Sequence, residues 1–454
     1  MAIETRNPAN SKIVKRFEAH SDAFVDNAIA RSVVAFEALR LWTFDERATC
    51  MNACADILDQ ENDALARIMT LEMGKTFKAA KAEVAKCAKV CRYYAQTASG
   101  HLADDSVQTQ AKKSYRKYLP MGPVLAVMPW NYPLWQVFRF AAPALMAGNT
   151  SLLKHASNVP QCALAIEDIF ARSGFPKDVF LALLIGGRKV ERVLRDPRIK
   201  AATLTGSELA GASVARICGE EIKPTLLELG GSDAFIVMPS ADLDEAVKFG
   251  TIARTQNNGQ SCIAAKRFFV HADVYEEFRD KLTRSFETLI VGDPMDEGTD
   301  IGPLVNEQAV KEVAAQVADA IEQGAKRLCG AEPVTGEGYY YKPGILDNIP
   351  LKARVYHEEI FAPVALLFKV NSLDEAIKIT NSSPFGLGSS IWTQDEKEME
   401  LAIRDIEAGA TFVNSMTSSN QVLPFGGVKR SGYGRELAAE GIRTFCNIKT
   451  VNIA

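Results

Sequence analysis

Short apolar runs alternate with helix-forming stretches from Pro123 onward, and this alternation constrains the fold more than any other feature. The first apolar runs are "VLAVMP" (124–129), "TSLLKH" (150–155), "DVFLALLI" (178–185) and "AATLT" (201–205). Helix-forming sequence separates them at 134–148, 159–174 and 188–197. Continuously apolar strands separated by helices predict a parallel sheet with helices on both faces. A second alternating series runs from Asp233 to about residue 424, so we expect an α/β protein with two doubly wound units.

The flanking segments have different patterns. Residues 22–99 carry apolar residues at spacings of three and four, which predicts three successive helices, the second ending near Gly74. The stretch "KKSYRKYLPMG" (112–122) predicts a strand, and the tail "LAAEGIRTFCNIKTVNIA" (437–454) ends in strand-like sequence. A chain of 454 residues is longer than one core normally organises, so we expect two or three domains.

Charge and hydropathy exclude several classes of function. The chain has 52 Lys and Arg against 56 Asp and Glu, a net charge of -4, so it offers no basic surface for nucleic acid or an anionic membrane. No apolar run approaches the roughly 20 residues that span a bilayer. The polar start "MAIETRNPAN" is unlike a secretory signal. We therefore expect a cytoplasmic protein.

Nine cysteines are spread without the spacing of a disulfide framework. Cys50 and Cys54, like Cys87 and Cys91, lie four residues apart in helical sequence, where they could form half of a metal site or serve as small apolar residues. With only five histidines in the chain, we favour the second interpretation and expect no metal. The thiols are expected to be reduced.

One strand of the first series leads into a candidate anion site. In "AATLTGSELAGASVARICG" (201–219), Gly206 permits a tight turn, Ser207 can cap the following helix, and Gly211 lets that helix lie close to its neighbour. Ligands bind at the carboxyl ends of strands in such sheets, which favours a nucleotide phosphate here. A capped helix without a ligand would explain the same residues.

Cys262 differs from the other cysteines because it follows the polar, turn-forming sequence "NNGQS". A thiolate on an accessible loop is a candidate nucleophile. A small apolar role is the alternative.

Five motifs resemble the aldehyde dehydrogenase superfamily, in the same order along essentially the whole chain. They are "PWNYP" (129–133), "LLELGG" (226–231), "NNGQSC" (257–262), "EEIFAP" (358–363) and "LPFGGVKRSGYGRE" (423–436). Within the superfamily the chain is most similar to bacterial NADP-dependent succinate-semialdehyde dehydrogenases. The resemblance implies two Rossmann-like domains and a small bridging β-sheet that joins protomers into a homodimer or a dimer of dimers. The implied segments are 1–99 and 119–229 for the cofactor domain, 230–424 for the catalytic domain, and 100–118 with 437–454 for oligomerisation.

The resemblance also implies the catalytic residues. Cys262 would attack the aldehyde carbon to give a thiohemiacetal, and Asn131 would stabilise the oxyanion. Glu228 would activate water to hydrolyse the thioester left after hydride transfer. Asn131 could instead cap the following helix, and Glu228 could instead form a structural salt bridge.

The implied cofactor is NADP, with weaker use of NAD possible. Its ribose 2′-phosphate would meet Lys154 and Ser157, and Lys177, after the next helix, would add positive charge. NAD-preferring relatives typically carry a glutamate where this chain has Ser157. A carboxylate there would repel the phosphate, whereas a hydroxyl can donate to it. The other expected cofactor contacts are Trp130, Gly206, Ser207, Gly211, Leu229, Glu359 and Phe361.

The implied substrate is a small aldehyde carrying a carboxylate. Arg139 and Ser419 would bind the carboxylate, and Trp135 would line the tunnel. A snorkelling Arg139 is the alternative. Two departures stand out: Gln256 occupies a position where some relatives have a second arginine, and Ala264 occupies one where some have a redox-active cysteine.

The sequence leads to three hypotheses of function. The first is oxidation of succinic semialdehyde to succinate, which would link 4-aminobutanoate degradation to the citric acid cycle. The second is a broader aldehyde dehydrogenase for aliphatic or aromatic aldehydes. A catalytically silent binding module is the third, and the intact set Asn131, Glu228 and Cys262 argues against it. The presence of Glu228 also disfavours a coenzyme-A-acylating enzyme.

Overall fold

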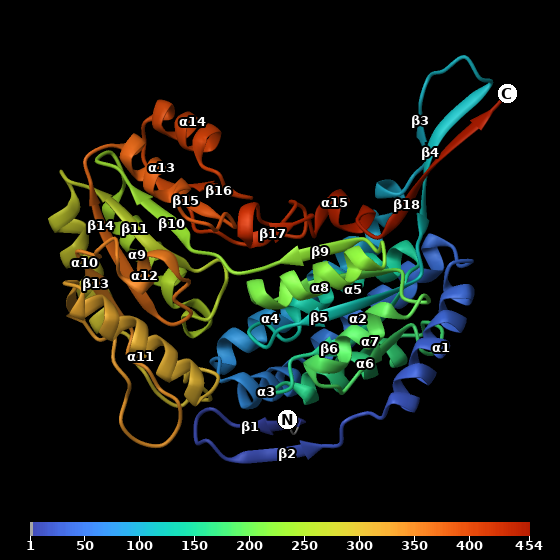
Figure 1. Cartoon of the computed structure of the whole chain (residues 1–454), viewed down its shortest axis with the longest axis horizontal. Coiled ribbons are helices and arrows are strands. Elements are labelled where there is room, and N and C mark those ends of the chain that lie inside the picture. The colour runs from blue at the N-terminus through green and yellow to red at the C-terminus, as the bar shows by residue number, and fades with distance from the viewer. Residues whose placement is uncertain (1–2) are drawn as a thin grey trace.

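The computed structural model describes residues 3–454 and contains two large, mostly parallel β-sheets (Figure 1). The first has six strands in the order β17 (Gly432–Tyr433), β9 (Thr225–Glu228), β8 (Ala201–Thr205), β5 (Pro123–Met128), β6 (Thr150–His155) and β7 (Phe180–Ala182). The second has seven, in the order β12 (Lys326–Cys329), β13 (Gly344–Asp347), β14 (Val364–Val370), β11 (Ala265–His271), β10 (Asp233–Val237), β15 (Ser389–Trp392) and β16 (Thr411–Val413). Apart from the antiparallel edge strands β17 and β12, all neighbours are parallel. The predicted α/β class is confirmed.

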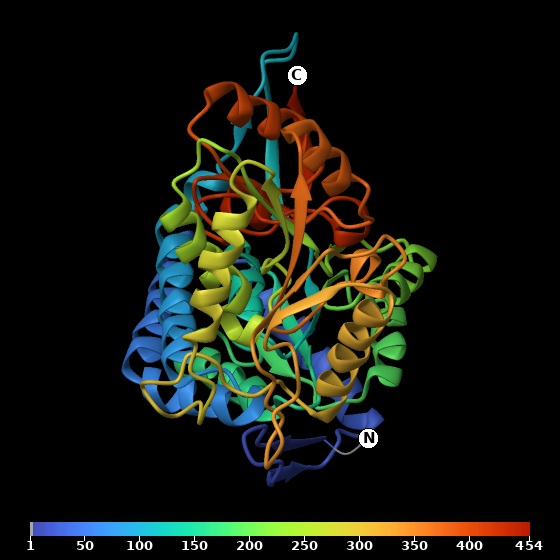
Figure 2. The same cartoon turned by 90° about the vertical axis from the view of Figure 1, so that its left-hand side faces the viewer.

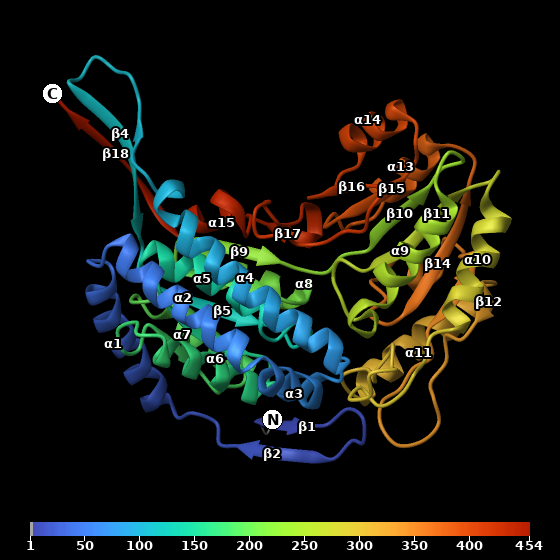
Figure 3. The ribbon, with the colours of Figure 1, turned by 180° about the vertical axis from the view of Figure 1, so that it is seen from behind.

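Helices cover both faces of the first sheet, because its strands are apolar on both sides. Leu125, Leu152 and Leu204 face one core, which α1 (Asp22–Leu39), α7 (Val190–Arg195) and α8 (Glu208–Glu220) complete. Ala126 and Leu153 face the other. The helices that complete this second core are α2 (Phe44–Gln60), α3 (Asn62–Met73), α4 (Phe77–His101), α5 (Trp135–Ala147) and α6 (Pro160–Arg172). In Figure 3, α2 and α4 lie in front of β5.

The N-terminal helices differ from the prediction in one respect. The apolar period from residue 44 to Gly74 predicts one helix, but the chain breaks at Glu61, where φ is -101° and ψ is 16°. The second piece, α3, ends at Gly74 as expected, and Gly74 adopts the left-handed conformation with φ of 85°.

The second sheet is covered in the same way. On one face, Phe235 and Phe268 pack against α9 (Leu243–Thr255) and α10 (Tyr275–Glu287). The other elements of this half are α11 (Glu307–Glu322), α12 (Arg354–His357), α13 (Leu373–Asn381) and α14 (Glu396–Asp405). Short 3₁₀ turns occur at Gly187–Lys189, Gln256–Gly259 and Lys429–Ser431, and α15 (Ala438–Arg443) precedes the last strand.

Two small sheets lie at opposite ends of the molecule (Figure 2). The predicted strand near residues 112–122 is β4 (Lys113–Pro120), and it pairs with β3 (Asp105–Ser106) and with the predicted C-terminal strand, β18 (Cys446–Ile453). This three-stranded sheet projects from the body of the molecule (Figure 1). The hairpin of β1 (Ile3–Arg6) and β2 (Ile13–Phe17) at the other end was not predicted, because its sequence is short and polar.

Candidate active site

The loop that carries Cys262 has three consecutive residues with left-handed backbone. Asn257 and Asn258 have φ of 55° and 58°, and Gly259 has φ of 74°. Asparagine tolerates this region better than most residues, and glycine adopts it freely. A Cβ on Gly259 would lie 2.3 Å from the backbone nitrogen of Pro363, so the loop packs directly on that chain. The sequence "NNG" therefore sets the path of the backbone that leads to Cys262.

Asn131 and Cys262 line the same cavity, which has a volume of about 190 Å³. The side chain of Asn131 is held from both ends: its Nδ2 donates to the Gln260 carbonyl at 3.1 Å, and its Oδ1 accepts from Gln136 Nε2 at 3.1 Å. Among residues 3–454, the second hydrogen on Nδ2 has no acceptor in the protein. An amide fixed in this way can donate to an oxygen formed beside Cys262.

The thiol of Cys262 is half-buried. Burial raises its pKa to about 12, while the positive charges of Lys266 and Arg139 act in the opposite direction. Burial thus disfavours the thiolate of Cys262, and nearby positive charge favours it.

Lys266 is a site residue that the sequence analysis missed. It is completely buried, and its Nζ donates to the carbonyl oxygen of Ser261 at 2.7 Å and to that of Cys262. The same Nζ lies 2.9 Å from Oε1 of Glu359. Lys266 thus connects the nucleophile loop to Glu359. A lysine within the apolar run "AAKRFFV" was the available signal.

Glu228 ends β9 and is buried, with 1% of its surface exposed. Its pKa is raised well above the usual carboxyl value, chiefly by burial and then by the negative charge of Glu436. Arg139 and the Gly427 backbone N–H act in the opposite direction, because they favour the ionised form. Neither carboxylate oxygen has a hydrogen-bond partner of normal geometry among residues 3–454. A buried carboxyl group with a raised pKa and unsatisfied oxygens is suited to proton transfer.

Arg139 lies in the same buried region as Glu228 and forms an ion pair with Glu436. Its guanidinium also lies over the ring of Phe425, 4.6 Å from the centroid, and its Nη2 is 3.5 Å from Thr205 Oγ1. These contacts place Arg139 in an internal charge cluster and exclude the surface-snorkelling alternative. Its predicted role as a carboxylate ligand stays a prediction.

The structure brings Trp135 and Ser419 together, and it adds Lys86 to them. The indole Nε1 of Trp135 donates to Ser419 Oγ at 3.1 Å, and Lys86 Nζ donates to the same oxygen at 2.7 Å. The Lys86 ammonium lies 4.1 Å from the centre of the Trp135 ring. Lys86 and Trp135 line a second cavity of about 390 Å³, which Gln256 also borders. Lys86 is half-buried, but it was missed because its sequence context resembles that of the exposed lysines in the same helical stretch.

Most of the predicted cofactor residues line the first cavity, on the same walls as Cys262. Trp130 and Phe361 make an edge-to-face pair with ring centres 5.9 Å apart. A Cβ on Gly230 would lie 2.6 Å from Glu359 Oε2, so the glycine leaves room for that carboxylate. The predicted residues on this cavity are Trp130, Gly206, Ser207, Leu229, Glu359 and Phe361.

The turn before α8 has the predicted cap. Ser207 Oγ accepts from the Ala210 backbone N–H at 3.4 Å. Gly211 is required for packing, since a Cβ there would lie 2.6 Å from Leu229 Cδ2. Gly206 does not have a positive φ, and a Cβ on it would make only an ordinary contact with Leu204, so the turn itself does not require glycine at this position. These residues present the start of α8 to the cavity, where its free N–H groups favour an anion.

Lys154, Ser157 and Lys177 lie outside the wall of this cavity. Lys154 is on β6, and burial lowers the pKa of its ammonium group. Ser157 follows the same strand and is half-buried, while Lys177 is exposed between α6 and β7. Their proposed contacts with a 2′-phosphate stay predictions.

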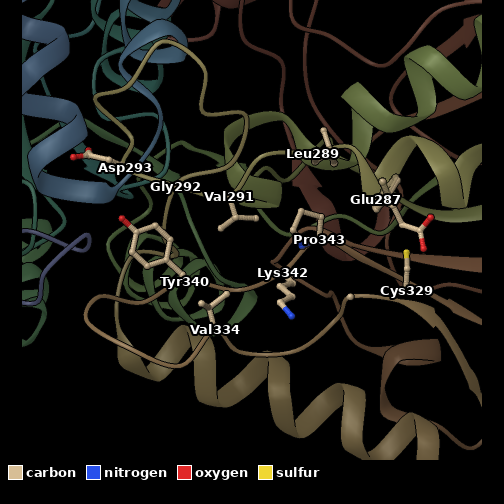
Figure 4. A pocket seen from close by; sticks show the side chains of 12 residues that line it. Glu287, Leu289, Val291, Gly292, Asp293, Cys329, Val334, Tyr340, Lys342 and Pro343 are labelled. Carbon is tan, nitrogen blue, oxygen red and sulfur yellow. The ribbon is translucent and has the colours of Figure 1, made fainter.

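A further cavity of about 590 Å³ is shown in Figure 4. Glu287, Cys329, Tyr340 and Lys342 are among its lining residues, and none of the predicted site residues lines it. All nine cysteines are unpaired. Across residues 3–454 there is no cluster of three or more His, Cys, Asp or Glu suited to a metal ion. In the same range, no helix has the length and apolarity to cross a membrane.

The comparisons of this chain's sequence and structure with known proteins agree with one another. Residues 1–451 match the aldehyde dehydrogenase family. Succinate-semialdehyde dehydrogenase [NADP(+)] of Mycobacterium avium is 58% identical over 455 residues, covering 99% of this chain and 96% of that protein. Succinate-semialdehyde dehydrogenase [NADP(+)] 1 of Mycobacterium tuberculosis is 57% identical, with both chains fully covered. The crystal structure of a Streptococcus pyogenes succinic semialdehyde dehydrogenase with NADP+ superimposes with a TM-score of 0.97 at 36% identity, again over both whole chains.

Proposed function

The chain belongs to the aldehyde dehydrogenase family, and from this premise we propose that it oxidises succinic semialdehyde to succinate with NADP. The observation that carries the proposal is the placement of Asn131 and Cys262 on one cavity that also contains the start of α8. The high identity to NADP-dependent succinate-semialdehyde dehydrogenases supports the choice of substrate and cofactor.

The first step is assigned to Cys262. Its thiolate attacks the aldehyde carbon, and the developing oxyanion accepts hydrogen bonds from the Asn131 amide and from the Cys262 backbone N–H. Removal of one such donor typically costs about 2.7–4 kcal/mol of transition-state stabilisation. When bound, NADP supplies the acceptor for the hydride that leaves the substrate carbon.

The second step is assigned to Glu228. Once the substrate is a thioester on Cys262, the carboxylate of Glu228 removes a proton from water, and the water oxygen attacks the carbonyl carbon. The carbon–sulfur bond then breaks, releasing the acid and the thiolate. The raised pKa of Glu228 suits a group that must accept and then return a proton near neutral pH.

The residues around the first cavity fit a dinucleotide. The capped start of α8 offers backbone N–H groups to a pyrophosphate, and Glu359 offers its carboxylate to ribose hydroxyls. Lys154 lies on the neighbouring strand β6 and Ser157 follows it, and we assign both to the 2′-phosphate, with Lys177 as an additional charge.

We assign residues 1–99 and 119–229 to the cofactor domain, 230–424 to the catalytic domain, and 100–118 with 437–454 to oligomerisation. The three-stranded sheet of β3, β4 and β18 supports the last assignment, because it projects from the body and exposes Ile448 and Ile453. Covering these side chains with a second copy would give a homodimer or a dimer of dimers. We further propose a cytoplasmic enzyme that links 4-aminobutanoate degradation to the citric acid cycle.

The test is a matrix of two cofactors and three aldehydes. We expect kcat/KM to be highest for NADP with succinic semialdehyde, and lower for butanal and benzaldehyde. The Cys262→Ala variant is the control and should be inactive with every pair. Equal kcat/KM for the three aldehydes would instead establish a broad-specificity aldehyde dehydrogenase.

A further inference from the structure

We propose that Lys86 is the residue that binds the distal carboxylate of the substrate. The inference rests on the proposed function and deepens it, because it names the group that selects aldehydes with a terminal carboxylate. The proposal gives Lys86 the role that the sequence analysis expected of Arg139, which is to supply the principal positive charge for the distal carboxylate of the substrate.

The first observation is that Lys86 is a cation without a carboxylate partner. Within residues 3–454, no Asp or Glu oxygen lies within 4.0 Å of its Nζ. Two nearby cations are already paired: Lys75 with Glu83, and Arg139 with Glu436. Glu83 and Glu436 are thus paired with other cations, and an anionic ligand would be the first full counter-charge of Lys86.

The second observation is that Lys86 is held in one position. Its Nζ donates to Ser419 Oγ at 2.7 Å and lies 4.1 Å from the centre of the Trp135 ring. Trp135 donates to the same Ser419 oxygen, so all three side chains are mutually ordered. A lysine ammonium has three hydrogens, and after the bond to Ser419 two remain for a carboxylate.

The third observation is that this group faces a cavity beside the reacting centre. Lys86, Tyr132 and Asn257 line the 390 Å³ cavity. Asn257 Nδ2 donates to the backbone oxygen of Asn131 at 2.8 Å, so one wall of this cavity is in direct contact with the oxyanion residue. The proposal therefore places the carboxylate of a short substrate at Lys86 and its aldehyde across this wall, at Asn131 and Cys262, which line the adjoining 190 Å³ cavity.

The surroundings of Lys86 also give it a titration near neutral pH. Burial lowers its pKa to about 8, and the charge of Arg139 on α5 contributes, while Cys87 and Glu83 on its own helix act in the opposite direction. Lys75 and Asp300 are the other charged groups on the cavity. Above pH 8 the free enzyme loses the Lys86 charge, and with it the attraction for a carboxylate.

The test measures kcat/KM for succinic semialdehyde and for butanal, and takes their ratio. In Lys86→Met we expect this ratio to fall about 10- to 100-fold, the usual loss for a hydrogen bond to a charged group. Lys86→Arg should retain a larger part of the ratio, because it keeps the charge. The matched control is Lys89→Met, on the exposed side of the same helix, which should keep the wild-type ratio.

Two further measurements keep the proposal independent of the folding of the variant. The inhibition constant of succinate against butanal oxidation should rise in Lys86→Met by a similar factor. In the wild type, the ratio of kcat/KM values should decrease as pH rises through about 8. A wild-type ratio near one at pH 7 would overturn the proposed function itself. A high wild-type ratio that survives in Lys86→Met, or that is constant from pH 7 to 9, would overturn the role of Lys86 alone.

Discussion

The guanidinium of Arg139 and the carboxylate of Glu436 form an ion pair whose side chains are 3% and 4% exposed. Glu228 shares this buried region, and the negative charge of Glu436 raises its pKa in addition to the effect of burial. Glu436 therefore disfavours the ionisation of Glu228, in addition to burial, without being assigned a place at the reacting carbon.

Replacing Glu436 by Gln should shift the acidic limb of the kcat–pH profile to lower pH. The substitution removes a negative charge that disfavours ionised Glu228, and it leaves Arg139 available to stabilise that form. A base with a lower pKa is ionised at a lower pH, so the limb moves in that direction. The measurement is kcat against pH under conditions where thioester hydrolysis limits the rate. Glu440→Gln, at an exposed position, is the control, and an unshifted limb in Glu436→Gln would contradict the coupling.

Glu228→Gln should form the thioester rapidly and then hydrolyse it slowly. We expect a rapid burst of NADPH close to one equivalent per active site, followed by a steady rate reduced about 10²- to 10⁴-fold, because a general base contributes that much. Stopped-flow absorbance measures both phases. Cys262→Ala should give no burst. If Glu228→Gln also lacked a burst, the carboxylate would be acting before hydrolysis.

Ser157→Glu should reduce the preference for NADP over NAD. A carboxylate at this position repels a 2′-phosphate and can accept hydrogen bonds from the two ribose hydroxyls of NAD. We expect the ratio of kcat/KM values, NADP over NAD, to fall at least tenfold, in line with the loss of a charge-assisted contact. Ser157→Ala removes the hydroxyl without adding charge and should have a smaller effect. An unchanged ratio in Ser157→Glu would place the 2′-phosphate elsewhere.

Gly259→Ala should destabilise the protein and impair the nucleophile loop. Left-handed backbone at a non-glycine residue costs about 1–3 kcal/mol, and the added Cβ would clash with Pro363 at 2.3 Å. We expect a lower Tm and a loss of kcat together. Gly219→Ala, on α8, is the matched control: it has open space around the new Cβ and should be neutral or stabilising by about 0.5–1 kcal/mol. Equal Tm values for the two variants would show that the loop relaxes freely.

The sequence was sufficient to predict features that depend on local pattern. The strands of the first sheet could be located because both of their faces are apolar, and the "NNG" turn before Cys262 has a conformation that its residue types favour. The exact break at Glu61 and the polar hairpin of β1 and β2 were missed, since neither has a strong local pattern.

Features that depend on distant parts of the chain could not be predicted. Lys86 meets Ser419 across 333 positions, and nothing near Lys86 in the sequence indicates this contact. The pairing of Arg139 with Glu436 also joins distant parts of the chain. Charged residues in apolar runs, such as Lys266 and Arg139, do indicate a buried partner, but the partner's identity depends on tertiary structure.

The antiparallel strand β17, which pairs Gly432 with Glu228 and Tyr433 with Leu227, has a consequence for biosynthesis. A ribosome that has made the first 425 residues has produced Asn131, Glu228 and Cys262. It has not yet produced β17, which pairs with β9, or Glu436, which raises the pKa of Glu228. Nascent chains fold from the N-terminus as they emerge, at about 5–20 residues per second. Catalytic activity should therefore arise late in translation, and chains terminated before β17 should be inert even when the other strands of both large sheets have formed.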